Sequence, residues 1–347
     1  MSETESRLPL WPWQVAPLQD ALQQLHSHAV LLHGSPGIGQ FEFALGLARA
    51  WLCESQTDAP LKPACGHCVS CKLIDAGSHP DLAVVLPENL QAMWGGALEG
   101  SDDGDTTEKA GKAKKLSGEI KVDAIRAVVQ FAQHTASRGR AKVVLIHPAE
   151  QLNMVAANTL LKTLEEPPGV VRFVLSGSAI DSLLPTVRSR CQAWRLPLPD
   201  ESSAAEWLQT QIQGISAADA QLLLRASGHQ PLTARERHQH GVDGSYWRQI
   251  PQDVAQGVPS KWTSWTLPLQ LDMLQKLCHD LASKAVGATP RFFPEESLPS
   301  APPLSRLTAW ANELRKLSRH AEHPWNANLK TEVLVQQAKL VLRSRQQ

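Results

Sequence analysis

The chain has no excess of charge of either sign, because 34 Lys and Arg residues balance 34 Asp and Glu residues among its 347 residues. Proteins that bind nucleic acid by themselves neutralise phosphates with surplus basic residues, so this class is disfavoured. Every apolar run is far shorter than the roughly 20 residues that cross a bilayer. The first residues, MSETESRLPL, contain no basic stretch followed by an apolar one. We therefore expect no secretory signal, no membrane partner and a cytoplasmic location.

Cysteine is scarce, with six residues in the whole chain, yet four of them gather in one segment. Cys53, Cys65, Cys68 and Cys71 follow the spacing C-x11-C-x2-C-x2-C. Such clustering indicates metal ligands in a reducing compartment rather than a disulfide framework. Four thiolates complete a tetrahedral zinc shell and leave no open position, so we predict a structural zinc ion as cofactor. The alternative is a set of buried free cysteines, which fits poorly with the Gly and Pro between them.

Two groups that a nucleotide-binding loop needs are missing. The stretch LLHGSPGIGQF follows an apolar run and places Gly34, Gly37 and Gly39 in the outline of a phosphate-binding loop, G-x-x-x-x-G-K-[ST]. Gln40 stands where Lys would bind phosphate, and Phe41 stands where Ser or Thr would bind the metal. The glycines remain useful without a nucleotide, because they make the tight turn from strand to helix.

The acidic residues of an ATPase are missing as well. An ATPase presents Asp and Glu after an apolar strand, where they position magnesium and polarise water. In KVVLIHPAEQLN the corresponding residues are His147 and Pro148. Imidazole is a poor ligand for magnesium, which prefers oxygen, and proline offers no side-chain donor or acceptor. We therefore predict a vestigial nucleotide fold with no productive ATP binding and no hydrolysis.

Short β-branched runs alternate with helical patterns from residue 29 to residue 196. The expected strands are Ala29–His33, Asp81–Leu86, Lys142–His147, Val171–Ser176 and Gln192–Leu196, and the expected helices between them cover 40–52, 121–135 and 151–166. This alternation predicts an α/β fold whose parallel sheet is covered on both faces. Residues 95–118 interrupt it with Gly, Asp, Lys, Thr and Ser, and we interpret them as a flexible surface insertion.

After residue 197 the pattern becomes helical, and no strand is evident. Residues 201–239 predict a small helical unit, and from about residue 244 helices alternate with Pro-rich breaks. One of these helices has an apolar stripe of Leu304, Leu307, Ala311, Leu314 and Leu317, and the last, about 327–344, carries Leu329, Val333, Leu340 and Val341 on one face. We therefore expect a separate all-α part, in which Cys278 is a small core residue.

Two arginines lie between a helical turn and the last expected strand. Arg188 and Arg190 flank Ser189 in the stretch LLPTVRSRC, which places Arg190 at the rim of the sheet. One interpretation is a solvated pair of arginines. The other is an arginine that completes the phosphate site of a neighbouring molecule, because a guanidinium is always charged and spans two phosphate oxygens.

The stretches NTLLKTLEEPP and LLPTVRSRC, together with the cysteine cluster followed by GSHPDL, resemble the delta-prime family of bacterial DNA polymerase III clamp-loader subunits. The resemblance covers essentially the whole chain, including HPWNANLK, and is weakest over 95–118 and 240–300. It implies an AAA+ (RecA-like) α/β domain over 1–197 with a zinc module at 53–71, a helical lid over 198–243 and a helical collar, or oligomerisation, domain over 244–347.

In this family the nucleotide motifs are degenerate in delta-prime and intact in gamma/tau. The resemblance therefore implies a noncatalytic subunit of a DNA-directed DNA polymerase holoenzyme, which helps to load the sliding clamp onto primed DNA. Its implied partners are the gamma/tau and delta subunits. Ser189-Arg190-Cys191 matches the family signature, whose arginine acts in trans as an arginine finger at a gamma/tau ATP site.

Two other functions remain as alternatives. An ATP-hydrolysing subunit of the gamma/tau type would require the residues that Gln40, Phe41, His147 and Pro148 replace. A zinc-dependent DNA-binding module would require basic residues beside the cysteines. The loop SRGRAK (137–142) could supply a phosphate contact or could be a solvated turn.

Overall fold

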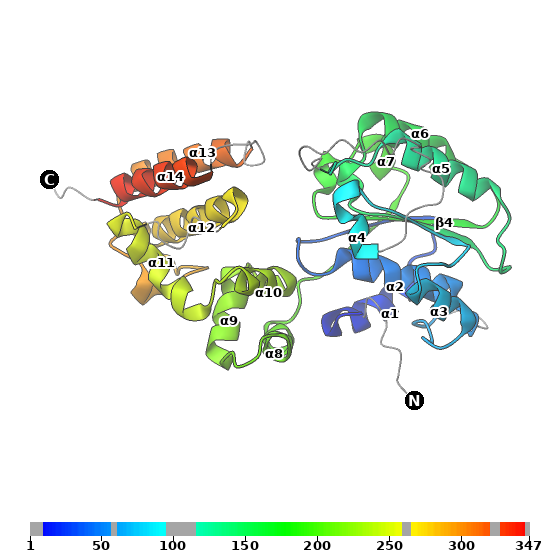
Figure 1. Ribbon diagram of the computed structural model, residues 1–347, viewed down its shortest axis with the longest axis horizontal. Coiled ribbons are helices and arrows are strands. Elements are labelled where there is room, and N and C mark those ends of the chain that lie inside the picture. The colour runs from blue at the N-terminus through cyan, green and yellow to red at the C-terminus, as the bar shows by residue number, and fades with distance from the viewer. Residues whose placement is uncertain (1–9, 57–60, 95–115, 259–264, 320–326, 344–347) are drawn as a thin grey trace, which may run out of the picture. The chain divides into compact units, whose positions relative to one another are not determined.

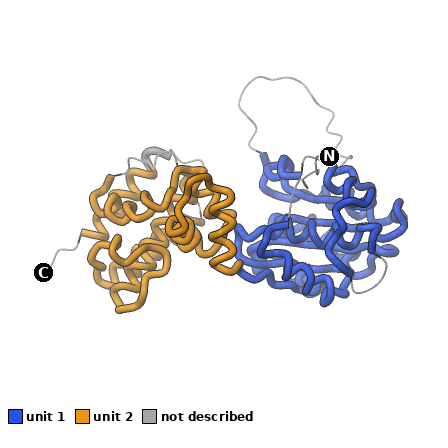
Figure 2. Tube along the Cα trace, turned by 90° about the horizontal axis from the view of Figure 1, so that it is seen from below, with its two compact units in different colours: residues 1–198 blue, residues 199–347 orange. Residues whose placement is uncertain are grey.

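A computed structural model describes residues 10–56, 61–94, 116–258, 265–319 and 327–343. The chain divides into two compact units, Met1–Leu198 and Pro199–Gln347 (Figure 2). Among the described residues, no helix has both the length and the apolar character that a membrane span requires.

The first unit is built on a sheet of five parallel strands. These are β1 (Ala29–His33), β2 (Leu82–Val85), β3 (Lys142–Ile146), β4 (Val171–Gly177) and β5 (Gln192–Arg195). Their order across the sheet is β2-β3-β4-β1-β5, and all four pairings are parallel. The carboxyl ends of the strands therefore lie along one edge, where loops carry functional side chains in folds of this type. The predicted strands are confirmed to within one residue at each end.

Helices cover both faces of this sheet (Figure 1). They are α1 (Val15–Gln24), α2 (Gln40–Leu52), α3 (Val69–Asp75), α4 (Gln91–Trp94), α5 (Val122–Gln133), α6 (Met154–Glu165) and α7 (Pro185–Arg188), with 3-10 turns at Pro12–Gln14, Glu88–Leu90, Ala149–Gln151 and Ile180–Ser182. Successive strand residues point to opposite faces. Val30 and Leu32 of β1 join the cluster with α1 and α2, whereas Ala29 and Leu31 join the cluster with α5 and α6. Both faces are thus buried, as the near-continuous apolar runs predict.

The predicted insertion at 95–118 falls on residues outside the described part of the chain, apart from its last three. Of those three, Ser117 is held by the loop before α4. Its backbone N–H donates to the Glu88 carboxylate (2.9 Å), and its carbonyl oxygen accepts from the Asn89 N–H (3.2 Å). The predicted flexibility of the insertion stays a prediction.

The described residues of the second unit form helices joined by loops, with no strand among them. It contains α8 (Glu201–Gln211), α9 (Ala217–Ala226), α10 (Pro231–Gln239), α11 (Gly244–Gln256), α12 (Leu267–Ala285), α13 (Leu304–Ser318) and α14 (Ala327–Leu342), with a 3-10 turn at Glu295–Ser297. One apolar cluster joins α9 to α11–α14, and the stacked rings of Trp247 and Phe293, 4.4 Å apart, lie within it. The predicted boundary between lid and collar at residue 243 stays a prediction.

The last helix buries only part of the apolar face predicted for it, since Val341 packs against the core cluster whereas two other members of that face do not. Val333 and Leu340 of α14 are exposed by 43% and 65%. The buried positions are Thr331, Leu334, Val335, Ala338 and Leu342. The helix carries apolar residues on more than one side, so periodicity alone did not decide which side contacts α11 and α12.

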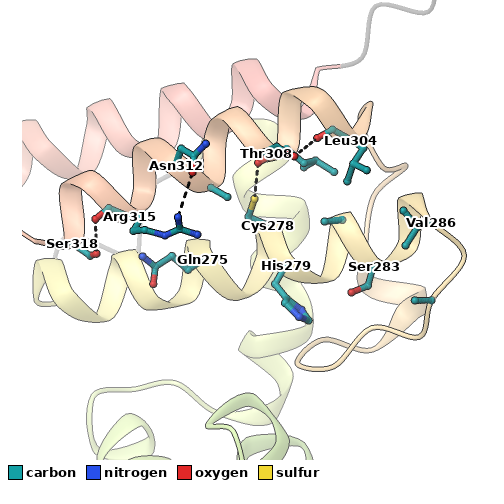
Figure 3. A pocket seen from close by; sticks show the side chains of 14 residues that line it. Gln275, Cys278, His279, Ser283, Val286, Leu304, Thr308, Asn312, Arg315 and Ser318 are labelled. Carbon is teal, nitrogen blue, oxygen red and sulfur yellow. Dashed lines mark hydrogen bonds between the residues drawn. The ribbon is translucent and has the colours of Figure 1, made fainter. Parts of the chain in front are cut away.

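A pocket of about 860 Å³ lies along α12 and α13, which pack against each other (Figure 3). Its lining includes small residues, among them Cys278, Ala282 and Ala311, which leave the space between the two helices. Cys278 is 2% exposed, and its S–H donates to the Leu307 carbonyl oxygen (3.3 Å). This cysteine is a small core residue, as its sequence context predicts.

Candidate functional site

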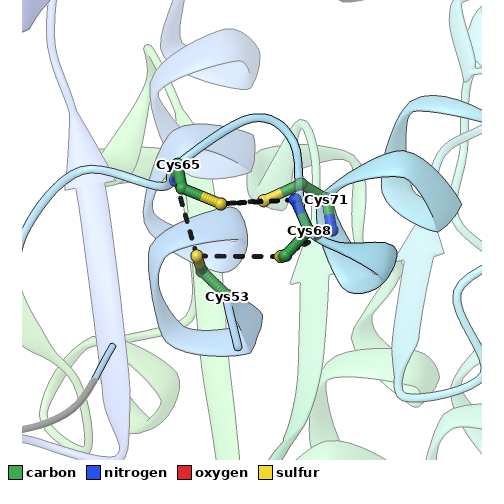
Figure 4. A group of neighbouring side chains, drawn as sticks. All are labelled: Cys53, Cys65, Cys68 and Cys71. Atoms are coloured by element: carbon green, nitrogen blue, oxygen red, sulfur yellow. Dashed lines mark hydrogen bonds between the residues drawn. The ribbon is translucent and has the colours of Figure 1, made fainter. Parts of the chain in front are cut away.

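The four clustered cysteines converge where α2 ends and α3 begins (Figure 4). Cys53 follows the last residue of α2, Cys68 caps the amino end of α3, and Cys71 lies one turn further along α3. All four sulfur atoms lie within 4.8 Å of one another. The Sγ atoms of Cys53 and Cys68 are 3.9 Å apart, and those of Cys65 and Cys71 are 4.0 Å apart.

These distances fit a tetrahedral metal site. Thiolates at about 2.3 Å from a zinc ion stand roughly 3.8 Å apart along the edges of a tetrahedron. His67 is exposed, and its Nδ1 lies 2.9 Å from the Cys65 carbonyl oxygen, so it is not a member of the four-ligand set. The cluster is thus compatible with a structural metal ion that links the end of one helix to the start of another.

Hydrogen bonds around the Cys65 sulfur favour its thiolate, whereas burial raises the pKa of the Cys71 thiol. The backbone N–H of Cys65 points to Cys53 Sγ and that of Cys68 to Cys65 Sγ, both at 3.4 Å, and the Ser55 hydroxyl donates to Cys65 Sγ (3.2 Å). Desolvation opposes ionisation of Cys65, but hydrogen bonds from Ser55 and from the backbone of His67 and Cys68 outweigh it and lower the pKa of this thiol to about 5. A low pKa of this kind suits a metal ligand.

The basic loop at 137–142 anchors the cysteine segment to the sheet. The guanidinium of Arg138 pairs with Glu54, and Arg140 donates to the Gln56 carbonyl oxygen (2.9 Å). The backbone N–H groups of Ser137 and Arg138 both donate to the buried carboxylate of Asp81, at 2.7 and 2.8 Å. Residues 137–139 form an exposed turn, in line with the solvated-turn interpretation, and the side chains of Arg138 and Arg140 also contact residues close to Cys53.

The glycine loop joins β1 to α2 and is closed by its own side chains. Gln40, at the position of the missing lysine, donates from Nε2 to the carbonyl oxygens of Gly34 (3.1 Å) and Ser35 (2.6 Å). A lysine at this position would extend toward a phosphate, whereas the shorter Gln40 amide turns back onto the loop. Gly37 and Gly39 have φ values of 71° and 88°, a conformation that favours glycine.

Residues before α1 cover the other end of the loop. Gln14 Nε2 donates to the carbonyl oxygens of Ile38 (2.9 Å) and Gly39 (2.6 Å), and Trp13 Nε1 donates to Ile38 (2.9 Å). A Cβ atom on Gly39 would lie 2.5 Å from Gln14 Nε2 and from Trp11 Cδ1. Gly39 is therefore needed both for its backbone conformation and for this close packing.

Phe41, at the position of the missing Ser or Thr, belongs to the hydrophobic core. Its side chain is 2% exposed and packs edge-on against Trp94, with ring centroids 6.3 Å apart. The His147 ring lies 5.4 Å from the Phe41 ring, and His147 Nδ1 lies 3.0 Å from the Ser176 hydroxyl. Burial lowers the pKa of His147, so its imidazole is neutral at pH 7. Apolar contacts thus replace the side chains that would face magnesium.

Arg190 lies between α7 and β5, with its side chain 30% exposed. Its Nη1 donates to the Thr186 carbonyl oxygen (2.7 Å), and its Nε donates to Glu165 Oε1 (2.6 Å). Arg188 pairs instead with Asp181 (2.9 Å). Burial raises the pKa of the neighbouring Cys191 thiol to about 12, so this partly buried cysteine is neutral and packs against the core beside an accessible arginine.

Comparison with known proteins agrees with the sequence resemblance. The profile of a family described as "DNA polymerase III, delta subunit" matches residues 14–200. DNA polymerase III subunit delta' of Pseudomonas aeruginosa is 36% identical over 273 residues, which cover 76% of this chain and 74% of the relative. The subunit delta' of Escherichia coli K12 is 34% identical over 269 residues, which cover 76% and 70%. This chain belongs to the DNA polymerase III delta-prime family.

A solved gamma subunit-related protein of Thermotoga maritima aligns with 94% of this chain and with 99% of its own length. Because the two chains are only 14% identical and the TM-score is 0.46, this likeness supports no conclusion about the chain. The family profile spans the cysteine cluster, the glycine loop and Arg190, which all lie in the first unit.

Three residues that contribute to these sites in the delta-prime chain were not predicted from its sequence. Trp13 and Gln14 cover the glycine loop, and Glu165 holds Arg190. For Trp13 and Gln14 the linear sequence carries no signal, because they lie 24 or 25 residues before the loop residues that they contact. Glu165 stands in the quoted stretch NTLLKTLEEPP, but only the folded chain brings it to a residue 25 positions later.

Proposed function

We propose that this chain acts as a noncatalytic delta-prime subunit of the DNA polymerase III clamp loader. In this role it joins gamma/tau and delta subunits in a ring of AAA+ modules that loads a sliding clamp onto primed DNA. The family membership supports the assembly, since the two relatives described above are delta-prime subunits of DNA polymerase III. The first unit corresponds to the AAA+ module, and the second corresponds to the lid (198–243) and the collar (244–347).

The proposal that the subunit is noncatalytic rests on the glycine loop, which is closed by hydrogen bonds from Gln40. Gln40 bonds back onto Gly34 and Ser35, and Phe41 is buried under Trp94 and His147. Gln40 and Phe41 therefore have structural roles of their own, in addition to lacking the groups that would bind phosphate and magnesium. A protein of the gamma/tau type needs those side chains directed at phosphate and magnesium, so the geometry supports delta-prime over the ATP-hydrolysing alternative.

The cysteine cluster supports a structural zinc ion as the cofactor. Cys53, Cys65, Cys68 and Cys71 would supply all four ligands, and the ion would tie the end of α2 to the start of α3. No coordination position would remain for a substrate, so the ion has no catalytic part. The ion pair between Arg138 and Glu54 would then link the metal-bound segment to the loop that precedes β3 of the sheet.

Arg190 is proposed to act in trans at an ATP site of a gamma/tau neighbour. Its guanidinium is accessible, lies at the rim of the sheet and has a fixed orientation toward Glu165 and Thr186. An arginine finger stabilises the charge that develops on the transferred phosphoryl group and accelerates other nucleotide hydrolases roughly 10³- to 10⁵-fold.

The test is a clamp loader reconstituted with the Arg190→Ala chain. We expect the variant to assemble and to retain its metal, whereas clamp loading falls by at least about tenfold. Total ATP turnover falls less, because other sites of the ring have their own arginines. Arg188→Ala is the matched control, since Arg188 is two residues away and already paired with Asp181. Wild-type loading by the Arg190→Ala assembly would exclude the trans role.

A further inference from the structure

We propose that Glu165 is a positioning residue for Arg190, holding the guanidinium with its outer edge directed at the partner's phosphate; this rests on the trans role proposed above. The two residues come from different elements. Glu165 is the last residue of α6, and Arg190 follows α7. Their side chains are 48% and 30% exposed, so the ion pair lies at the surface.

The contacts of Arg190 leave a particular edge available. Nε and Nη2 both donate to Glu165 Oε1, and Nη1 donates to the Thr186 carbonyl oxygen at 2.7 Å. Nη2 keeps one further N–H, and the second N–H of Nη1 faces the Ser189 hydroxyl at a long 3.4 Å. A guanidinium has five donors in one plane, and a pair on adjacent nitrogens matches two phosphate oxygens. The side edge, Nε and Nη2, is thus bound by Glu165, and the outer edge can offer a ligand the remaining N–H of Nη2 together with the N–H of Nη1 that makes only the long contact to Ser189.

Glu165 sits on a rigid support. Leu160 and Leu164 of the same helix are buried at 0% and 1% exposure, and Pro167 follows the helix directly after Glu166. A carboxylate at the carboxyl end of a helix opposes the helix dipole, so Glu165 is poorly placed to stabilise its own helix. A cation at this end is favourable, and Arg190 supplies it.

The pair acts through orientation rather than stability. A surface ion pair contributes little to folding, because solvent screens the charges and both side chains lose freedom. Arginine has many rotamers, and a side chain already held in one of them loses less entropy when it binds. Glu165 therefore accelerates ATP hydrolysis at the neighbour's site, because it holds Arg190 in the required orientation before Arg190 binds the phosphate.

The experiment compares five variants in the reconstituted clamp loader, measuring clamp loading against ATP concentration. They are Glu165→Ala, Glu165→Gln, Glu166→Ala, Arg190→Ala and the double variant Glu165→Ala/Arg190→Ala. We expect Glu165→Ala to lower the maximal loading rate about three- to tenfold, with the half-saturating ATP concentration unchanged within about twofold. Glu165→Gln retains an oxygen that accepts from Nε, so its loss is smaller. Glu166 is the exposed neighbouring carboxylate, and its alanine variant behaves as wild type.

The double variant separates positioning from a general structural effect. If Glu165 acts through Arg190, the double variant loads as slowly as Arg190→Ala alone. A further loss in the double variant shows that Glu165 acts elsewhere and overturns the inference. A wild-type loading rate for Glu165→Ala would show that Glu165 does not contribute, and it overturns the inference. A faster rate also overturns it, because it would show that the ion pair keeps Arg190 away from the partner. If Arg190→Ala itself loads at the wild-type rate, the proposed trans role fails, and the positioning role fails with it.

Discussion

The side-chain amide of Gln40 donates a 2.6 Å hydrogen bond to the carbonyl oxygen of Ser35, five residues earlier in the same loop. In a working nucleotide loop, the side chain at this position extends to the phosphates. Here it stabilises the loop without a ligand, and Gln14 does the same from the other side through Ile38 and Gly39. The loop therefore keeps its turn, and the side chain that a working loop would direct at phosphate takes part in internal hydrogen bonds.

Restoring the missing side chains is expected to fail as a way of creating an ATPase. The double substitution Gln40→Lys and Phe41→Thr removes the loop hydrogen bonds and a buried aromatic ring, and His147-Pro148 still offers no magnesium ligand. Loss of a buried Phe costs about 3 to 5 kcal/mol of unfolding free energy. Urea unfolding and an ATPase assay check both parts. Gln40→Lys alone is the control, because it leaves Phe41 in place; turnover by either variant would contradict the prediction.

Gly39 is expected to tolerate no side chain. Gly39→Ala places a methyl group 2.5 Å from Gln14 Nε2 and forces alanine to φ 88°. Gly139→Ala is the matched control, since Gly139 has φ 74° but no atom within 4 Å of the added Cβ. The left-handed conformation costs about 1–2 kcal/mol at either site, and the overlap adds about 1–3 kcal/mol at Gly39 alone. Equal losses of unfolding free energy for the two variants would show that the contact is unimportant.

The cysteine cluster is expected to bind about one zinc ion per chain. Structural zinc sites contribute on the order of 10 kcal/mol to local folding, so removal of one ligand has a large effect. Cys68→Ser should release the metal and make the segment 53–75 sensitive to protease. Cys278→Ser is the control, because Cys278 lies in α12 of the second unit. Elemental analysis of protein purified without chelator measures the ion, and an absence of zinc there would exclude the site.

Lys276 of the second unit is expected to make stability depend on pH. Burial, followed by the nearby charge of Arg237, lowers the pKa of its ammonium from 10.5 to about 8. The unfolded lysine keeps its proton up to about pH 10.5, so between pH 8 and 10.5 the unfolded state binds more protons. Unfolding free energy therefore rises with pH over that range. Below pH 8 the buried charge costs up to about 3 kcal/mol.

Lys276→Met tests this directly. Asp272 keeps its other partner, Arg237, so the variant is not left with an isolated carboxylate. We expect it to be more stable than wild type by about 1–3 kcal/mol at pH 7, and this advantage shrinks at pH 9.5 as the wild-type lysine loses its proton. Chemical unfolding at the two pH values measures the difference, and an advantage independent of pH would refute the assigned cause.

Local patterns determined the elements and the residue types of the sites. The strands were predictable because both faces of a parallel sheet are buried, which makes each strand a short apolar run. The gathering of the cysteines was predictable because Cys65, Cys68 and Cys71 are close along the chain. The degenerate motif was likewise readable, since Gln40 and Phe41 follow directly after the glycines that define it.

Only the tertiary structure decided which surfaces and side chains meet. Val333 and Leu340 of α14 are apolar yet exposed, because neighbouring helices cover the face with Leu334 and Val335 instead. The loop at 137–142 anchors Glu54 and Gln56, which come more than 80 residues earlier. Glu165 reaches Arg190 because α6 and α7 pack together, and Gln14 reaches Gly39 because the segment before α1 crosses the loop. Such contacts depend on how elements pack over long sequence separations, and periodicity and spacing describe only the residues within one element.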